Sequence, residues 1–395
     1  MAFIEQTNFK GRKAVIRVDF NVPLDSSYNV TDDTRIRAAK PTIMKVLEDG
    51  GSCILMSHLG RPDENENKFS LKHIVSKVEE IIGVNIIFSE DCVGDKTNKT
   101  AKSLLPGQVM LLENLRFYKE ETQGDYGFAK ALGSLGDFYI NDAFGTAHRA
   151  HASTTVIAEF FPNDKCFGYL LAKEIESLEK VMSKGEKPVL AILGGAKVSS
   201  KITIIENILD KIDHLIIGGG MSFTFVSAKG GLVGDSICET DKQELALEIL
   251  KVAAEKNVKV HLPVDVLAAN DFNNSAQTKI IEIDNIPRGW QGLDCGPKSK
   301  AIFHDVVQSC KTILWNGPLG VFEMDTFSTG TVSLGKSIAE ATQKGAFSLV
   351  GGGDSVAAVK KFNFDKSVSY VSTGGGAMLE NLEGKVLPGI AAILN

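Results

Sequence analysis

The stretch Ala346–Phe362, AFSLVGGGDSVAAVKKF, predicts a strand, a glycine turn and a helix in direct succession. Phe347–Val350 is a short apolar run suited to a buried strand, and three glycines follow it. Asp354 or Ser355 then offers a cap for the helix. A turn without Cβ atoms lets backbone N–H groups approach a ligand closely, and the helix presents its positive end there. The stretch therefore predicts either a phosphate-binding turn or a tight turn with an N-cap and no ligand.

Asp354 stands directly after the glycines, and its carboxylate adds a second kind of ligand to this turn. Proteins usually hold Mg²⁺ with a carboxylate and phosphate oxygens. If a phosphate binds at the glycine turn, Asp354 is the residue that we expect to bind the metal.

The composition, 43% hydrophobic and 23% charged, is that of a protein with large cores, and 395 residues predict roughly two to three domains. The net charge of −6 argues against nucleic acid or a membrane surface as the main partner. No apolar run approaches the ~18 residues of a membrane span. Six scattered cysteines without a CxxC pair, and an N-terminus without an apolar signal region, predict a cytoplasmic protein with reduced thiols.

Short apolar runs alternate with longer amphipathic stretches along the chain. Most of the short runs are β-branched or aliphatic with little alternation, which is typical of parallel strands covered on both faces. The sequence therefore predicts an α/β protein with two doubly wound, Rossmann-like parallel sheets. The expected strands are Ala14–Asp19, Cys53–Ser57, Ile86–Phe88, Val109–Leu112, Phe138–Asn141, Val189–Leu193, Leu215–Ile217, Val260–Leu262, Thr312–Trp315, Phe347–Val350 and Val368–Val371, and the expected helices include Leu71–Ile82 and Ser199–Lys211.

The residues that follow the strands differ between the two halves, and ligands of open α/β sheets bind beyond the carboxyl ends of strands. The first half offers Arg and His, whereas the second offers glycine turns, a Lys and an acid. We therefore expect one site for a small anion and one for a nucleotide. The first set is Asp19, Asn21, His58, Arg61, Glu113, Asn114, Arg116, Asn141, Asp142 and Arg149, and the second is Gly194, Gly195, Lys197, Gly218–Gly220, Asn316, Gly317, Gly351–Asp354 and Thr373–Gly376.

The basic residues of the first half lie together near strand ends, and this joint placement favours a ligand-binding role for them. Several Arg forks at one site suit a small substrate that carries both a carboxylate and a phosphate. A surface for a polyanion would instead show Lys/Arg runs, and this half has none. The basic set is Arg17, Arg35, His58, Arg61, Arg116, His148, Arg149 and His151.

Tyr169–Lys184 has apolar residues on one helical face and is stopped by Gly185 and Pro188. The pattern fits a long helix that joins two domains, and equally a peripheral helix of either domain.

Gly330–Ser337, GTVSLGKS, matches the P-loop expression GxxxxGK[ST] letter for letter. A P-loop follows a buried strand directly, but the preceding Glu323–Thr329 is polar and acidic. Thr329 can instead cap a helix. We interpret the match as accidental and expect Lys336 to face solvent.

Motifs along essentially the whole chain resemble phosphoglycerate kinases and occur in that family's order. They are Arg17–Pro23 (RVDFNVP), Ser57–Pro62 (SHLGRP), Leu112–Phe117 (LENLRF), Asp142–Ser153 (DAFGTAHRAHAS), Gly194–Lys201 (GGAKVSSK), Trp315–Glu323 (WNGPLGVFE), Gly351–Ala357 (GGGDSVA) and Thr373–Ala377 (TGGGA). Ser200 and the run Ser153–Phe160 depart from the usual pattern. Neither departure touches a position to which we assign chemistry.

The resemblance implies transfer of the acyl phosphate of 1,3-bisphosphoglycerate to Mg-ADP, giving 3-phosphoglycerate and Mg-ATP. It implies a glycerate site made by Asp19, Asn21, Arg35, His58, Arg61, Arg116 and Arg149. It implies a nucleotide site made by Lys197, Lys201, Gly292, Asn316, Glu323, Gly352, Gly353, Asp354 and Ser355, with Asp354 on Mg²⁺, Glu323 at the ribose and Gly292 at the adenine.

The same resemblance implies a monomer with residues 1–170 as the glycerate domain, 171–184 as the connecting helix and 185–377 as the nucleotide domain, with 378–395 packing back on the first domain. If the ligands sit on separate domains, direct in-line transfer requires the domains to close, and the connecting helix is where we expect the bend.

In the ATP-consuming direction the chemistry needs no general base, because the attacking carboxylate is ionised at neutral pH, with a pKa of about 4. The protein has to align the partners and neutralise charge on the moving phosphoryl group. The candidates for this role are Arg35, Lys197, Mg²⁺ and the amides of Gly374, Gly375 and Gly376.

Two other functions stay open at this point. An NAD-dependent dehydrogenase would show GxGxxG after an early strand, where this chain has VDFNVP. A non-catalytic sugar-phosphate binding protein would keep the Arg set, but it has no use for Asp354, Lys197 and Glu323 together.

Overall fold

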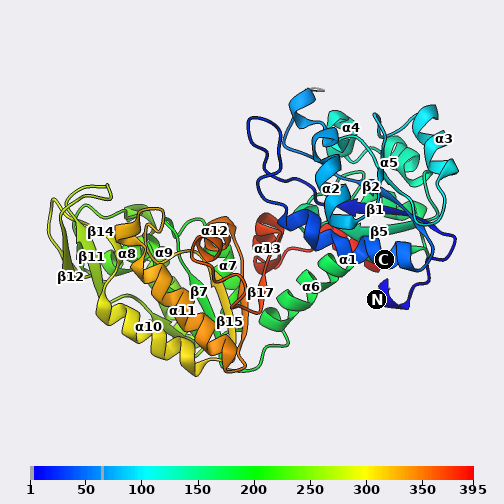
Figure 1. Cartoon of the computed structure of the whole chain (residues 1–395). Coiled ribbons are helices and arrows are strands. Elements are labelled where there is room, and N and C mark those ends of the chain that lie inside the picture. Colours follow the sequence, from blue (N-terminus) through cyan, green and yellow to red (C-terminus); the bar gives the residue numbers. More distant parts are fainter. Residues whose placement is uncertain (1–3, 64–65) are drawn as a thin grey trace. The chain divides into compact units, whose positions relative to one another are not determined.

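The computed structural model describes residues 4–63 and 66–395, which form an α/β protein with two six-stranded parallel sheets (Figure 1). The chain divides into two compact units. Unit 1 takes the residues up to Ile175 together with Val386–Asn395, and unit 2 takes Glu176–Lys385. The predicted fold class, two doubly wound parallel sheets, is confirmed.

The sheet of unit 1 has the strand order β3-β4-β2-β1-β5-β6, with every pair parallel. All residues of β2, β4 and β5 are buried, as expected for strands covered on both faces. The strands are β1 (Lys13–Val18), β2 (Ser52–Met56), β3 (Ile86–Phe88), β4 (Val109–Leu111), β5 (Phe138–Asp142) and β6 (Lys165–Phe167).

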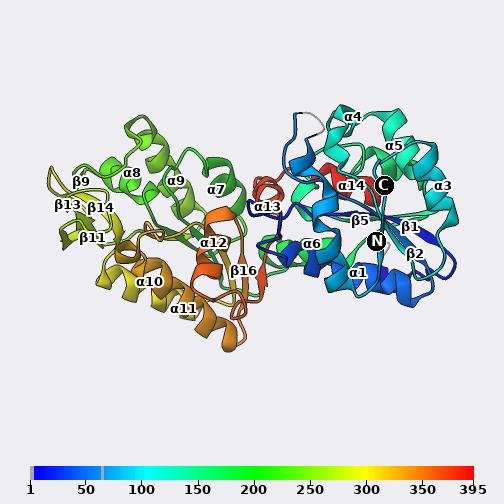
Figure 2. The same ribbon diagram turned by 45° about the horizontal axis from the view of Figure 1, so that its top comes forward.

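Helices cover both faces of this sheet (Figure 2). α1 (Thr34–Glu48) buries one apolar stripe that includes Ile36, Ile43 and Val46, and it packs on α2 (Val75–Ile82). The other helices are α3 (Asp95–Ser103), α4 (Lys119–Gln123), α5 (Tyr126–Gly133) and the carboxy-terminal α14 (Pro388–Leu394).

The C-terminal segment belongs to unit 1. Gly389 N donates a 2.9 Å hydrogen bond to Ala147 O. Lys165 Nζ donates to Ala392 O at 2.8 Å, and Asn141 Nδ2 donates to Gly389 O at 3.1 Å.

The main sheet of unit 2 has the order β10-β8-β7-β15-β16-β17 and is also parallel throughout. Its strands are β7 (Val189–Leu193), β8 (His214–Ile217), β10 (Lys259–His261), β15 (Thr312–Asn316), β16 (Phe347–Val350) and β17 (Tyr370–Val371). Its helices are α7 (Ile202–Ile208), α8 (Met221–Ala228), α9 (Gln243–Glu255), α10 (Pro297–Ser309), α11 (Thr329–Gln343), α12 (Gly353–Lys361) and α13 (Gly375–Leu382). Figure 2 shows α8 and α9 on one face of the sheet and α10 and α11 on the other.

Unit 2 also contains a three-stranded antiparallel sheet that the sequence did not predict. Its order is β12-β11-β14, built from β11 (Asp265–Ala269), β12 (Thr278–Glu282) and β14 (Gln291–Cys295). A short parallel pair, β9 (Leu232–Val233) and β13 (Asn285–Ile286), forms a separate two-stranded sheet. β12 is largely exposed, so it lacks the apolar run by which the parallel strands were predicted.

α6 (Tyr169–Met182) forms where a long connecting helix was expected. Its first residues belong to unit 1 and its last to unit 2. The expected helix Ser199–Lys211 is shorter, because residues 194–201 form an irregular loop before α7.

Two predicted helix caps are wrong. α12 begins at Gly353 with Gly352 as its N-cap, and Ser355 instead accepts a 2.6 Å hydrogen bond from Gly317 N. α11 has Ser328 as N-cap, while Thr329 Oγ1 donates to Asp294 Oδ2 at 2.9 Å.

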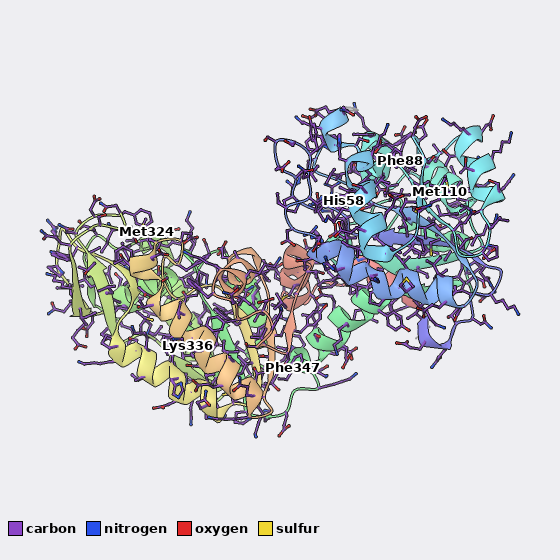
Figure 3. All side chains as sticks on the ribbon, in the orientation of Figure 1. His58, Phe88, Met110, Met324, Lys336 and Phe347 are labelled. Atoms are coloured by element: carbon purple, nitrogen blue, oxygen red, sulfur yellow. The ribbon has the colours of Figure 1, made fainter. Side chains whose placement is uncertain are left out.

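The P-loop match Gly330–Ser337 lies inside α11 and not in a phosphate-binding loop. Lys336 is exposed on that helix (Figure 3). The interpretation of the match as accidental is therefore confirmed.

Candidate functional site

The polar residues of unit 1 gather where β1 and β5, which are neighbours, end. β1 continues through α1 to β2 on one side, and β5 lies on its other side, so the order of the strands reverses here. Such a switch point is the usual place for a ligand in a doubly wound sheet.

Asp19, Asn21 and Arg35 form one hydrogen-bonded cluster beyond β1. Arg35 Nη1 lies 2.9 Å from Asp19 Oδ2 and also donates to Asn21 O at 3.2 Å. Asn21 Oδ1 accepts a 2.8 Å hydrogen bond from Gly60 N. The loop after β1 is thus tied both to α1 and to the loop after β2.

Arg61, Arg116 and Arg149 line a cavity of about 340 Å³ together with Tyr118 and Lys119. Arg116 Nη1 donates a 2.6 Å hydrogen bond to Gly60 O. Burial and the neighbouring guanidinium groups, including those of Arg149 and Arg61, lower the pKa of Arg116 to about 10. Like charges held this close are costly without an anion, so the cavity suits a negatively charged ligand.

His58 is buried beside this cluster and contacts Arg17, whose Nη2 lies 3.2 Å from His58 Nδ1. Burial, with the positive charges of Arg17, Arg116 and Arg35, holds the pKa of His58 well below its usual value. His58 is therefore neutral at physiological pH. The seven residues predicted to bind the glycerate thus lie around the ends of β1 and β2 and the adjoining cavity.

The loop after β2 is held in place by Asn114, which is fully buried. Asn114 Nδ2 donates to Leu59 O at 2.8 Å and to Phe69 O at 2.9 Å. Its Oδ1 accepts from Leu59 N at 3.2 Å and from Arg116 N at 3.0 Å. One amide therefore positions the backbone of both arginine-bearing loops.

In unit 2 the corresponding reversal lies between β7 and β15, which are adjacent. The turns after these strands approach so closely that a Cβ on Gly194 would clash with the backbone of Gly317 and Pro318. Gly317 has φ +115°, a conformation that side chains disfavour. The two glycines explain why this pair of turns can form one crevice.

Lys201, Asn316 and Gly352 meet at this crevice. Lys201 Nζ donates to Asn316 Oδ1, and Asn316 Nδ2 donates to Gly351 O at 2.8 Å. Burial lowers the pKa of Lys201, and the carboxylate of Asp354 partly opposes this. Gly352 has φ +91°, and a Cβ there would press on the Asn316 amide.

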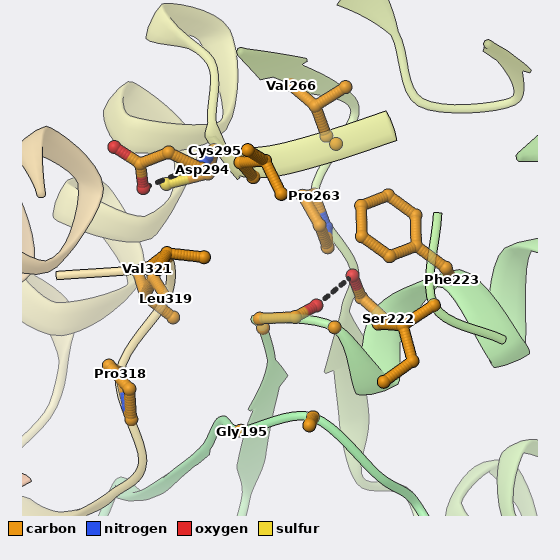
Figure 4. A pocket seen from close by; sticks show the side chains of 18 of the residues that line it. Gly195, Ser222, Phe223, Pro263, Val266, Asp294, Cys295, Pro318, Leu319 and Val321 are labelled. Atoms are coloured by element: carbon orange, nitrogen blue, oxygen red, sulfur yellow. Dashed lines mark hydrogen bonds between the residues drawn. The ribbon is translucent and has the colours of Figure 1, made fainter. Parts of the chain in front are cut away.

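A largely apolar cavity of about 310 Å³ opens next to these residues (Figure 4). Phe223, Val266, Leu319 and Val321 line it, and Gly292, Glu323 and Asp354 from the predicted nucleotide set lie in its lining. A slot with apolar walls and a few polar groups at its edge suits a planar base.

Asp294 also borders this cavity and was not predicted. It accepts hydrogen bonds from Gly330 N at 2.8 Å and Cys295 N at 2.9 Å. Burial raises the pKa of Asp294 to about 6 despite these donors. These contacts join β14 to the start of α11, so we interpret Asp294 as a residue that shapes the slot.

Gly374 and Gly375 form the start of α13, with Gly374 as N-cap. A Cβ on Gly375 would lie 3.7 Å from Gly353 N, the first residue of α12. The amino ends of two helices therefore meet beside Asp354, which favours anions there. Lys197 is exposed in the loop after β7.

Sequence reasoning placed the polar residues but missed the apolar walls. Phe223, Leu319 and Val321 carry no chemistry that marks them as site residues, and α8, which holds Phe223, is buried on most sides. Arg17 was noted only as one of a basic set, because nothing in a strand pattern shows which neighbour its side chain meets.

No helix within residues 4–63 and 66–395 has the length and apolar character needed to cross a membrane.

Comparison with known proteins matches residues 4–385 to the family described as phosphoglycerate kinase. The phosphoglycerate kinase of Porphyromonas gingivalis is 53% identical over 414 residues, covering 99% of each chain. The cytosolic enzyme of Triticum aestivum is 50% identical, covering 98% of this chain and 96% of its own. The structure of phosphoglycerate kinase from Coxiella burnetii has a TM-score of 0.91 at 40% identity, covering 99% of this chain and 98% of its own. That from Pyrococcus horikoshii has a TM-score of 0.83 at 30% identity, covering 100% and 98%. On this evidence the chain belongs to the phosphoglycerate kinase family.

Proposed function

We propose that the chain carries out its family's reaction by direct phosphoryl transfer between a glycerate site on unit 1 and a nucleotide site on unit 2. The reaction itself, reversible transfer of the acyl phosphate of 1,3-bisphosphoglycerate to ADP, follows from family membership. One observation best supports separate sites for the two substrates. The cavity of unit 1 is lined by arginines, whereas the slot beside Asp354 in unit 2 is largely apolar.

The glycerate ligand would meet Arg61, Arg116 and Arg149 through its phosphate and its carboxylate. Guanidinium groups bind both anions with paired N–H donors. Arg35 uses Nη1 for Asp19 and Asn21, and a guanidinium has five N–H donors in all. The Asp19 carboxylate and the Asn21 amide can orient Arg35 and accept from the ligand's hydroxyl.

The nucleotide would place its base in the slot at Gly292, where a Cβ would run into the ring of Phe223. Glu323 would bind the ribose. The phosphates would then reach the amino end of α12 through Gly352, Gly353 and Ser355, and would meet Lys197, Lys201 and Asn316.

Mg²⁺ would be held by Asp354, which is exposed in the first turn of α12. Among the described residues no group of three or more His, Cys, Asp or Glu could hold a metal. This fits a metal that takes one carboxylate from the protein and its other ligands from phosphate and water. Bound there, Mg²⁺ would supply charge to offset that of the phosphate oxygens.

The chain's own residues have two tasks in the transfer. They hold the carboxylate of the acceptor in line with the phosphoryl group, and they balance the charge that spreads over its oxygens. We assign the second task to Arg35, Lys197 and the amides of Gly374 and Gly375. In the ATP-consuming direction no residue needs to act as a general base, because the nucleophile is an ionised carboxylate.

Because the two sites lie on different units, transfer requires them to come together, with α6 absorbing the bend. Small-angle scattering with both substrates should therefore give a smaller radius of gyration than scattering without them. Identical curves would rule out closure. We further propose a cytoplasmic monomer.

The decisive test is 3-phosphoglycerate-dependent consumption of Mg-ATP by the purified chain. We expect turnover, and ATP binding without 3-phosphoglycerate. A protein that binds ATP but gives no turnover would contradict the glycerate site.

A further inference from the structure

Arg17 is buried in β1 and contacts residues that follow the two neighbouring strands, Ser153 after β5 and His58 after β2. Its Nε donates to Ser153 Oγ at 2.9 Å, and its Nη1 donates to Val18 O. Its Nη2 lies 3.2 Å from His58 Nδ1. Both Arg17 and His58 are at most 3% exposed, so water does not compete for these contacts.

The contact with Arg17 determines which nitrogen of His58 carries the ring proton. A guanidinium has donors and no acceptor, so Nδ1 of His58 must accept and can carry no proton. A ring without a proton on Nδ1 is neutral and carries its single proton on Nε2, which agrees with the lowered pKa of His58. Nε2–H is then the only donor that the imidazole can offer to a ligand.

Arg17 is in turn held from its other side by a buried carboxylate. Ser153 Oγ donates to Glu121 Oε1 at 2.6 Å, and Ser153 N donates to Glu121 Oε2 at 3.0 Å. His151 Nδ1 lies 3.7 Å from the same carboxylate. Burial opposes ionisation of Glu121, yet His151, Arg17 and Ser153 together lower its pKa. An ionised Glu121 only accepts, so the Ser153 hydroxyl must point its proton to Glu121 and its lone pairs to Arg17.

We propose that Arg17, held in place through Ser153 by Glu121, sets the tautomer of His58, so that Nε2–H donates to the anionic glycerate ligand. Arg17 and Glu121 are positioning residues, because they act through His58. The tautomer stands on the contacts alone, whereas its use rests on the proposed glycerate site.

The tautomer can be measured directly in the full chain labelled with ¹⁵N-histidine. Long-range ¹H–¹⁵N spectra near neutral pH distinguish a protonated from an unprotonated ring nitrogen, and the variant His58→Gln assigns the signal. We expect a neutral His58 with the proton on Nε2. A wild-type His58 that is doubly protonated, or that carries its proton on Nδ1, overturns the proposal without any variant.

Variants then test which residues set the tautomer. Arg17→Met removes the donors, and we expect His58 to populate the other tautomer or to become charged. The Michaelis constant for 3-phosphoglycerate should rise about tenfold, the loss expected for one hydrogen bond to a charged group, while that for Mg-ATP stays unchanged. Glu121→Gln keeps one acceptor oxygen, replaces the other by an NH2 donor and removes the charge, so we expect the same changes at smaller size.

Glu120→Gln is the matched control, because Glu120 is the exposed neighbour of Glu121 in α4. It should leave both the spectrum and the kinetics unchanged. If Arg17→Met fails to fold, Glu121→Gln and the wild-type spectrum still decide the question. An unchanged His58 signal in a folded Arg17→Met or Glu121→Gln protein overturns the positioning role.

Failure of the proposed glycerate site would look different. In that case the wild-type tautomer would be as expected, but His58→Gln would leave the Michaelis constant for 3-phosphoglycerate unchanged.

Discussion

Arg35 and Asp19 form an ion pair, with 2.9 Å between Nη1 and Oδ2, where β1 ends and the loop before α1 begins. The pair is only partly exposed, and Arg35 also donates to Asn21 O. The guanidinium is therefore held in one orientation before any ligand arrives, which lowers the entropic cost of using it.

Replacing Arg35 by Ala should lower kcat by about 10²–10⁴, equivalent to about 3–5 kcal/mol, because it removes the charge that we propose balances the moving phosphoryl group. Steady-state kinetics checks this, and ATP binding by calorimetry should be unchanged. Arg37→Ala is the control, since Arg37 lies in the same helix and pairs with Asp33 in solvent. Equal losses in the two variants would contradict the role of Arg35.

Replacing Asp354 by Asn should weaken binding of Mg-ATP about tenfold or more while binding of metal-free ATP changes little, because the variant removes only the carboxylate that we propose as the metal's ligand. Titration calorimetry with and without Mg²⁺ measures both. Asp365→Asn, an exposed change beyond α12, should alter neither. The assignment of the metal to Asp354 fails if both forms of ATP weaken equally.

Gly352→Ala should impair nucleotide binding and lower stability by roughly 1–3 kcal/mol, because its backbone has φ +91° and the added Cβ presses on Asn316. Gly353→Ala is the matched comparison. Gly353 has nothing within 4 Å of its Cβ position, and alanine keeps the amide that starts α12. Thermal unfolding with and without ATP should separate the two variants, and similar behaviour of both would refute this account of the turn.

Asp142 should make the stability of unit 1 fall as the pH rises from about 4 to about 6. Its pKa is raised by burial from 3.8 to about 6 in the folded protein. A raised pKa gives a contribution that is complete below the unfolded value and lost as pH rises through the folded value.

Asp142→Asn keeps an oxygen for Leu171 N, which donates to Asp142 Oδ1 at 3.2 Å. It should be more stable than the wild type at neutral pH by up to about 3 kcal/mol, and this gain should vanish near pH 4. Calorimetric unfolding across this range measures the difference. A constant difference between the two proteins would show that Asp142 does not titrate there.

The parallel sheets could be predicted because their strands are buried on both faces. Val189–Leu193 is a continuous apolar run and Phe347–Val350 is apolar except for Ser348, and the observed bounds of both equal the predicted ones. Thr278–Glu282 instead gains its strand form from pairing with Asp265–Ala269. An exposed strand of this kind carries little apolar signal of its own, so β12 was missed, whereas β11 and β14 are mostly buried and their short runs were not recognised.

The site was predictable to the extent that chain position determines it. Residues at the carboxyl ends of the parallel strands of one sheet share its edge. Asp19 and His58 could therefore be located at the edge of the first sheet, and Asn316 at the edge of the second, from their strands alone. The partner of each side chain could not be predicted in this way. The contacts of Lys201 with Asn316 and of Arg17 with His58 depend on how neighbouring loops fold over the edge of the sheet. The assigned roles of these residues remain predictions until tested.

Unit 1 is assembled from two segments of chain separated by the whole of unit 2. A chain that is cut off before Val386 therefore contains all of unit 2 but leaves unit 1 without α14. Such a chain lacks the hydrogen bonds of Gly389 and Ala392 to Ala147 and Lys165. Limited proteolysis of this truncated chain should show a protease-resistant unit 2 and a cleavable unit 1. Completion of unit 1 thus depends on a segment that is synthesised only after all of unit 2.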